Sequence, residues 1–244
     1  MKLFNIIVPV YNETSSIVDF LNSFYSNNIS EIKDFGELVI VNDGSNDDTL
    51  NKLENYKLNK KRKIISYPKN SGYGYALNQG ISYSMNRSKY VIFMDSDLTN
   101  PISDIKKVTN KMRLNVDFIK GNRFHSNGGV NQLPINRRFF TKYGNLISRN
   151  LCNIKIKDCT NGFRAVKTCL YEGVNFKEND FSIIMEEIYF LKTKILTVAE
   201  FNTKIGQRKL EQTESSFNYN LNLIFKYFKY SFLSFFKKSN IKYI

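Results

Sequence analysis

The stretch "YVIFMDSDLTNP" (90–101) passes from five apolar residues into two aspartates separated by one serine, and then into a proline. The apolar part is short and rich in aromatic and β-branched residues, which is typical of a buried strand. Asp95 and Asp97 lie where that strand ends, and Pro101 is suited to the first turn of a helix. We therefore predict a strand at 90–95, a polar loop and a helix at 101–114.

The same alternation is found on both sides of this stretch. Apolar runs rich in Ile, Val and Phe occupy 4–10, 37–43, 63–68 and 116–121. The segments between them carry helix signals at about 14–25, 45–56 and 75–85, and further helices are expected at 137–151 and 182–194. Strands that alternate with helices form a parallel sheet covered on both faces. The predicted fold class is α/β, with a doubly wound, mostly parallel sheet.

Composition limits the class of protein. The chain has 244 residues and a net charge of +14, from 36 Lys+Arg against 22 Asp+Glu, so we expect one compact unit with polyanionic partners. Three cysteines and one histidine favour neither a disulfide framework nor a zinc site, and fit a reducing cytosol. We find no run of 18 apolar residues and no cleavage signal, and so expect neither a membrane span nor a signal peptide.

Acidic side chains end several of the predicted strands. In an extended chain Asp95 and Asp97 point to the same side, roughly 7 Å apart at the Cα atoms, so both can approach one hard cation. Asp43 in "VNDGS" (41–45) is placed to accept hydrogen bonds from a base or ribose, and "VPVYNE" (8–13) ends the first strand. Ligands of such sheets bind beyond the carboxyl ends of the strands. An ordinary turn at Asp43, and a helix cap at Asp95 or Asp97, are the alternatives.

Two other chemistries are disfavoured. The stretch "NSGYGYALNQG" (70–80) contains glycines, but no Gly-x-Gly-x-x-Gly follows the first strand and no Gly-Lys-Ser/Thr occurs, so dinucleotide and P-loop sites are not predicted. The basic residues are dispersed and no recognised DNA or RNA module is present, so we expect no nucleic-acid partner.

Six motifs, in order, resemble glycosyltransferase family 2, which has the Rossmann-like GT-A fold. They are "VPVYNE" (8–13), "VNDGS" (41–45), "MDSDLTNP" (94–101), "GNRFHSNGGV" (121–130), "NRRFFTKYGNLISRNL" (136–151) and "DCTNGFR" (158–164). The chain most closely resembles the catalytic domain of dolichol-phosphate mannosyltransferases and related polyprenyl-phosphate glycosyltransferases, over about residues 3–216. The resemblance implies a nucleoside-diphosphate sugar donor (GDP- or UDP-linked), a divalent cation (Mg²⁺ or Mn²⁺) and inversion at the anomeric carbon.

The resemblance also implies roles for individual residues. Asp95 and Asp97 match the ligands of the metal and the diphosphate, and the residues that match the donor-binding positions are Pro9, Tyr11, Glu13, Asp43 and Ser96. The family often has Gln where this chain has Thr99, which leaves a third metal ligand open. The residues that match phosphate-binding positions are Arg123, Arg138 (or its neighbour Arg137), Arg208 and Ser215, while Ser216 stands where the family commonly has lysine.

The acceptor decides whether a protein base is needed. A lipid phosphate, whose second pKa is about 6, is already a nucleophile, whereas a sugar hydroxyl requires a carboxylate base. Glu186, or Glu187 beside it, matches an acidic position of the family and serves either as that base or to orient basic residues near the phosphates. His125 is interpreted as a loop residue. Two alternative functions are the transfer of a sugar to a hydroxyl of a growing glycan, and the binding of a nucleotide sugar without catalysis.

The last 28 residues differ in character from the rest. Residues 217–244 contain five lysines and no acids, and their apolar residues follow helical spacing. We predict a catalytic domain at 1–216 and a basic amphipathic helical tail at 217–244 that lies on an anionic membrane surface, which makes the protein cytoplasmic and peripherally attached. A helix that packs on the enzyme itself is the alternative.

Overall fold

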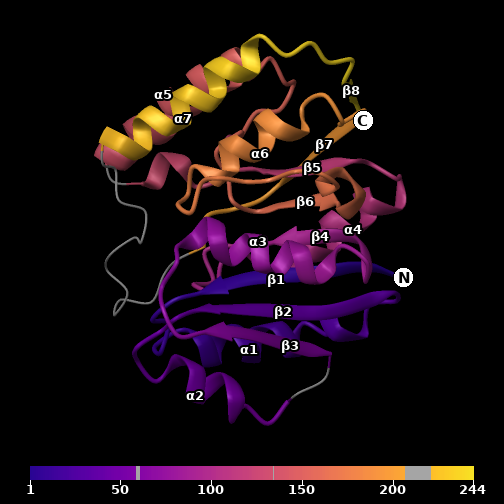
Figure 1. Ribbon diagram of the computed structural model, residues 1–244, viewed down its shortest axis with the longest axis vertical. Coiled ribbons are helices and arrows are strands. Elements are labelled where there is room, and N and C mark those ends of the chain that lie inside the picture. Colours follow the sequence, from indigo (N-terminus) through magenta and orange to yellow (C-terminus); the bar gives the residue numbers. More distant parts are fainter. Residues whose placement is uncertain (59–60, 134, 207–220) are drawn as a thin grey trace.

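The computed structural model describes residues 1–58, 61–133, 135–206 and 221–244. Its centre is an eight-stranded sheet with the order β3-β2-β1-β4-β6-β5-β7-β8 (Figure 1). Within the described ranges β6 is the antiparallel member, between β4 and β5, and the remaining neighbours pair in parallel. The predicted α/β class is therefore confirmed. The strands are β1 (Lys2–Val10), β2 (Phe35–Asp43), β3 (Arg62–Tyr67), β4 (Ser88–Phe93), β5 (Phe118–Asn122), β6 (Arg164–Lys167), β7 (Thr197–Asn202) and β8 (Lys242–Tyr243).

Helices cover both faces of this sheet. One hydrophobic core joins the sheet to α1 (Ile17–Ser26), α2 (Thr49–Glu54) and α4 (Ile105–Arg113). The other core joins it to α3 (Tyr73–Ser84), α6 (Ile183–Leu191), the end of α5 (Ile135–Cys152) and α7 (Leu221–Phe235). Strands buried on both faces read as continuous apolar runs, which explains the sequence pattern. Short 3₁₀ turns lie at Ile29–Glu31, Ile102–Asp104, Val130–Gln132 and Thr168–Tyr171.

The C-terminal segment returns to the body of the molecule. Helix α7 lies side by side with α5, above α6 at the top of Figure 1. Strand β8 then pairs in parallel with β7 at the edge of the sheet. The amphipathic helix predicted in the tail is present as α7, and it packs on α5 and α6. No helix in the described part of the chain is long and apolar enough to cross a membrane.

Candidate active site

A cavity of about 900 Å³ opens at the carboxyl ends of β1, β2 and β4. The sheet brings together at this edge residues that lie far apart in the sequence, as expected for parallel strands. Eight of the predicted site residues line the cavity: Pro9, Tyr11, Glu13, Asp43, Asp95, Ser96, Asp97 and Arg123. Arg138 and Glu186 are not among the lining residues. Arg208, Ser215 and Ser216 lie outside the described residues.

Asp97 is held in a tight turn after β4. Its Oδ1 accepts hydrogen bonds from the Thr99 backbone N–H (3.0 Å) and from the Thr99 hydroxyl (2.5 Å). Leu98 between them has a φ of 59°, in the left-handed region that non-glycine residues seldom adopt. The backbone N–H of Gly206 donates to the Thr99 carbonyl at 2.8 Å, which joins this turn to the segment that follows β7. Strain of this kind persists where surrounding contacts fix the backbone, and it concentrates at functional sites.

A divalent cation is compatible with this corner of the cavity. The described residues hold no group of three or more His, Cys, Asp or Glu side chains that could form a complete protein cage for a metal. Asp95 and Asp97 nevertheless line the same cavity. Mg²⁺ is typically bound by one or two carboxylates together with substrate phosphates and water. The two aspartates therefore fit a cation that arrives with a diphosphate.

Asp43 is fixed by the loop that precedes α3. Its Oδ1 accepts the backbone N–H of Ser71 at 2.8 Å, and its Oδ2 accepts that of Gly72 at 2.9 Å. The side chain is buried, yet it borders the cavity. Each carboxylate oxygen keeps further acceptor capacity after one such bond. Asp43 can therefore still accept hydrogen bonds from a ligand in the cavity.

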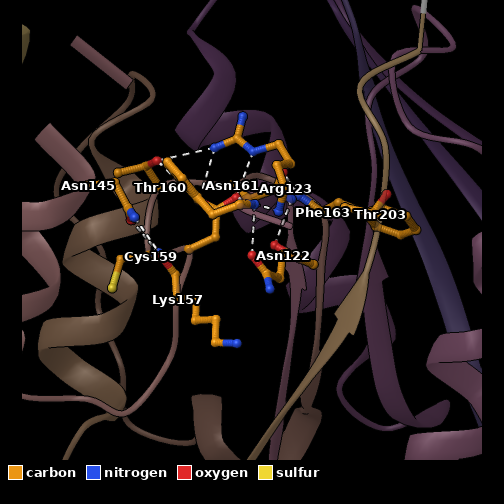
Figure 2. Close-up of polar contacts among 12 residues, drawn as sticks. Asn122, Arg123, Asn145, Lys157, Cys159, Thr160, Asn161, Phe163 and Thr203 are labelled. Atoms are coloured by element: carbon orange, nitrogen blue, oxygen red, sulfur yellow. Dashed lines mark hydrogen bonds and ion pairs between the residues drawn. The ribbon is translucent and has the colours of Figure 1, made fainter. Parts of the chain in front are cut away.

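Arg123 is locked in place by an ion pair with Asp158. Figure 2 shows Arg123 beside Thr160, with Asn145 bonded to Lys157 nearby. Its Nε lies 2.7 Å from Asp158 Oδ2 and its Nη2 lies 3.0 Å from Oδ1, a two-pronged ion pair. Nη2 also donates to Thr160 Oγ1 at 3.2 Å. Asn145 of α5 bonds to the backbone on both sides of Asp158, at the Lys157 carbonyl and the Cys159 N–H. The guanidinium is thus presented to the cavity in one orientation.

Sequence reasoning missed these supports. Asp158 opens the motif "DCTNGFR" (158–164), and its place in that motif was the only available signal, one that does not show which residue it contacts. Tyr73 was also missed. Its ring stacks on Phe181 with centroids 4.3 Å apart, and both side chains line the cavity. Burial, and then the charge of nearby Asp95, raise the pKa of Tyr73, so its hydroxyl stays protonated.

Glu186 and Glu187 both lie in the interior. Neither Glu186 nor Glu187 lines the cavity. Glu186 accepts hydrogen bonds from the backbone N–H groups of Lys177 (2.9 Å) and Glu178 (3.0 Å). Glu187 forms a buried ion pair with Arg164, with Nη2 3.0 Å from Oε1. Both carboxylates therefore serve as acceptors for neighbouring protein groups.

Arg138, predicted to bind phosphate, and His125, predicted to be a loop residue, both have local partners. The Nη1 of Arg138 donates to the Asn131 carbonyl at 3.1 Å. The ring Nε2 of His125 lies 2.9 Å from the Thr203 carbonyl, which agrees with a loop role. These contacts hold the loop between β5 and α5 beside the cavity.

The opposite wall of the cavity is apolar. It is formed by side chains from α5 and α7, namely Phe139, Phe140, Tyr143, Ile147, Leu223, Ile224, Tyr227 and Phe228. The polar strand ends and this apolar wall border one continuous space. A ligand that fills it would therefore combine a strongly polar part with a hydrocarbon part.

A family comparison identifies the class of protein that this fold and site define. Residues 5–173 match the model of glycosyl transferase family 2, and the chain belongs to that family. Its fold is GT-A, as in glucosyl-3-phosphoglycerate synthase from Mycobacterium tuberculosis (TM-score 0.58, 18% identity, 86% of this chain and 75% of that one). TarS of S. aureus, solved in complex with UDP-GlcNAc, is also similar (TM-score 0.54, 19% identity, 84% and 60% of the two chains).

Curated relatives include lipid-phosphate glycosyltransferases. A dolichol-phosphate mannosyltransferase of Pyrococcus furiosus is 29% identical over 206 residues, which cover 84% of this chain and 56% of the relative. A dolichyl-phosphate beta-glucosyltransferase of Trichomonas vaginalis is 28% identical over 143 residues, which cover 54% of this chain and 42% of the relative. The chain thus spans about half the length of these relatives. It belongs to a family of glycosyltransferases, as predicted.

Proposed function

We propose that this enzyme transfers a sugar from a nucleoside-diphosphate sugar to a polyprenyl phosphate, with inversion at the anomeric carbon. The observation that carries the proposal is the two-sided cavity, which joins Asp43, Asp95, Asp97 and Arg123 to the apolar wall of α5 and α7. A nucleotide sugar fits the polar side, and the first isoprene units of a lipid phosphate fit the apolar side. The two dolichyl-phosphate transferases among its relatives support the same acceptor class.

Residues of the polar side would act on the leaving group. Asp95 and Asp97 would hold Mg²⁺ or Mn²⁺, whose charge offsets the negative charge that develops on the departing diphosphate. A solved structure of the mycobacterial synthase contains Mn²⁺ and UDP, in agreement with such a site. Arg123, held by Asp158, would donate hydrogen bonds to phosphate oxygens. Pro9, Tyr11, Glu13 and Asp43 would surround the nucleoside, with Ser96 between the metal ligands.

The acids of the cavity favour a phosphate acceptor over a hydroxyl. The acidic residues that line the described cavity are Glu13, Asp43, Asp95 and Asp97, all assigned here to donor and metal. Glu186 is turned away toward the backbone of Lys177 and Glu178. A hydroxyl acceptor would need a carboxylate base, whereas a phosphate dianion attacks the anomeric carbon without one. The lipid phosphate therefore matches the acids that this cavity offers.

We also propose that the enzyme attaches to the cytoplasmic face of a membrane through α5 and α7. Both helices expose apolar side chains, which are Ile135, Phe139, Phe140, Tyr143, Leu146 and Ile147 on α5 and Leu221, Phe225, Phe232, Phe235 and the following Phe236 on α7. Residues 217–244 add five lysines and no acids, a charge that complements anionic lipid. The same two helices form the apolar wall, so a lipid chain could pass from bilayer to cavity without crossing water.

The experiment is a screen of UDP- and GDP-linked sugars with Mn²⁺, read by release of nucleoside diphosphate. Each donor is tested with a polyprenyl phosphate, with the matching polyprenol and with soluble oligosaccharides. We expect turnover with the phosphate and none with the polyprenol, because the nucleophile is the phosphate oxygen. The variant Asp97→Ala, which lies at the polar cleft, is expected to abolish that turnover while the protein stays folded.

Three results would contradict the proposal or one of its assignments. Turnover with an oligosaccharide hydroxyl alone would favour glycan extension. No metal-dependent turnover with any donor would favour a binding protein. Near-wild-type activity of Asp97→Ala at saturating Mn²⁺ would remove the metal assignment from that residue.

A further inference from the structure

Residues 176–182 form a strip, which we name the linking strip, between helix α7 and the loop that begins α3. On the α3 side the Gly74 N–H donates to the Asn179 carbonyl at 2.8 Å. The two backbones are so close that a Cβ on Gly72 would lie 2.2 Å from the Asn179 oxygen, and one on Gly74 would lie 2.1 Å from the Glu178 oxygen. The linking strip and the 72–74 backbone therefore cannot move independently.

On the other side, charged and hydroxyl side chains of α7 form ion pairs and hydrogen bonds with the linking strip. Lys226 Nζ lies 2.6 Å from Glu178 Oε2 and 2.7 Å from Asp180 Oδ2. The Tyr230 hydroxyl donates to Glu178 Oε1 at 2.8 Å, and the Tyr227 hydroxyl donates to the Phe181 carbonyl at 3.0 Å. The Glu178 carboxylate, with a 10% exposed side chain, thus has both oxygens bonded by α7. Removing one partner of a buried charge strongly lowers stability, so we expect the contacts between α7 and Glu178 to be sensitive to substitution.

The linking strip is connected by contacts to Asp43, the residue predicted to bind the nucleoside. The backbone N–H groups of Ser71 and Gly72 hold both oxygens of Asp43, and the same loop bonds to the linking strip through Gly74. Phe181 of the linking strip stacks on Tyr73, which lines the cavity. A shift of Glu178 and Asp180 would therefore reach Asp43 through a continuous set of contacts.

We propose that Lys226 and Tyr230 of α7 are positioning residues for the nucleoside of the donor. The inference rests on the proposed function, because it assumes a nucleotide beside Asp43. It gives the C-terminal helix a second role, independent of any lipid: the helix holds the linking strip, the linking strip holds the 71–74 loop, and the loop holds Asp43 in the orientation that accepts the nucleoside.

The test is calorimetric binding of UDP and GDP, each with Mn²⁺, to the full chain without lipid. We expect Lys226→Met to weaken the affinity for the preferred nucleotide at least about fivefold, the lower end of typical couplings between distant groups. Tyr230→Phe, which keeps the volume of the side chain, is expected to have a smaller effect in the same direction. Lys226→Arg should restore most of the affinity, because a guanidinium can bond to both carboxylates.

A matched variant separates position from charge. Lys238→Met removes the same charge from the same C-terminal segment, but Lys238 is exposed and lies beyond the end of α7, away from the linking strip. We expect wild-type nucleotide affinity for this variant. In transfer assays Lys226→Met should raise the donor KM with little change in kcat, a split that a general loss of stability would not produce.

The outcomes are distinguishable. If the wild type binds nucleotide and Lys226→Met, folded by circular dichroism, binds it equally well, the inference is wrong while the proposed function stands. If the wild type binds neither nucleotide, the proposed function fails and the inference fails with it. Should Lys226→Met not fold, unchanged affinity in Tyr230→Phe would overturn the inference in its place.

Discussion

The ion pair between Arg123 and Asp158 shows how one residue prepares another for chemistry. Asp158 is fully buried and accepts three hydrogen bonds from Arg123, two from the guanidinium and one from the backbone N–H. Arginine side chains in water sample many rotamers, so fixing one in advance lowers the entropy cost of binding a phosphate. Asp158 therefore contributes to the site without lining the cavity.

Replacing Asp158 with Asn should separate this positioning from simple stability. The amide keeps the size but loses the charge that holds the guanidinium, and we expect kcat/KM to fall about tenfold or more, since small misplacements of a catalytic group are costly. Steady-state kinetics with the preferred donor measure the effect. Asp117→Asn is the control, because Asp117 is paired with Lys167 away from the cavity. Equal losses of activity in the two variants would contradict a specific role for Asp158.

Lys120 is a second residue with an unusual environment. It is fully buried in β5, and its Nζ has no hydrogen-bond partner in the described part of the molecule. Burial, and then the charge of Arg164, lower the pKa of Lys120 to about 7, while Glu187 and Asp158 act in the opposite direction. Between pH 7 and the ordinary lysine pKa the unfolded chain therefore binds a proton that the folded chain does not.

This difference in bound protons predicts how the stability of the protein changes with pH. Because the unfolded state binds more protons in that window, the contribution of Lys120 to stability rises with pH and is least favourable near pH 7. We expect Lys120→Met to raise the free energy of unfolding at pH 7 by about 1–3 kcal/mol, the cost of a buried unsatisfied group. Urea denaturation at pH 7, 8 and 9 should show the advantage of the variant shrinking as pH rises. A difference that is constant with pH would contradict the assignment.

At the scale of elements, the sequence predicted the first half of the sheet better than the second. Strands β1, β2 and β4 are buried on both faces and carry long apolar runs, so their positions were predictable. Strand β6 has four residues, and it contains the fully buried Arg164, whose charge is neutralised by Glu187 from another element. Such a partner is set by tertiary packing and cannot be read from local pattern.

The residues of the candidate site also differ in how far the sequence predicts them. Residues at the ends of predictable strands, such as Asp43 and Asp97, could be identified from the sequence. The supports of Arg123 could not, because Asn145 and Asp158 come from a helix and a loop that meet only in the folded molecule. The wall that α7 adds to the cavity was likewise not predicted, since the helical spacing indicates an apolar face without showing what it contacts.

The terminal strand β8 gives a prediction at this scale. Glu200 of β7 accepts the Tyr243 hydroxyl at 2.6 Å and the Lys157 backbone N–H at 2.6 Å, so β8 braces the residue next to Asp158. We expect Tyr243→Phe to lower the free energy of unfolding by about 0.5–1.5 kcal/mol, the usual net value of one hydrogen bond. Thermal or urea denaturation measures this. Tyr11→Phe is the control for stability, because Tyr11 is similarly exposed (44% against 46%) and its hydroxyl has no hydrogen bond within the described ranges. An equal effect of both changes would argue against the brace.

At the scale of the whole molecule, polar and apolar surfaces are organised around one cavity. The sheet supplies acids at one side, and α5 and α7 supply the apolar wall and an exposed apolar face beside it. Exposed apolar patches of this extent usually mark an interaction surface. Removing the whole tail would also remove a cavity wall and a strand, so point substitutions on its outer face are the cleaner test of membrane attachment.

The last prediction concerns that face. Fully burying one phenylalanine in an apolar environment contributes about 1.5–3 kcal/mol, and each lysine near anionic lipid adds about 1 kcal/mol that salt can screen. Changing Phe225, Phe232 and Phe236 together to serine should therefore lower partitioning into anionic liposomes by about two orders of magnitude or more. All three are more than half exposed, at 68%, 55% and 66%, so the fold should tolerate the change. Co-sedimentation at low and high salt measures the partitioning.

The matched control removes the same number of exposed apolar side chains from other surfaces. Leu58, Leu114 and Leu196 are 49%, 58% and 65% exposed and lie outside α5 and α7. Serine at these three positions should leave sedimentation unchanged, because a bilayer that contacts the α5–α7 face would not contact them. High salt should weaken binding of the wild type and of this control alike, since the lysine contribution is electrostatic. Equal sedimentation of the phenylalanine variant and the wild type would show that this face does not hold the enzyme on the membrane.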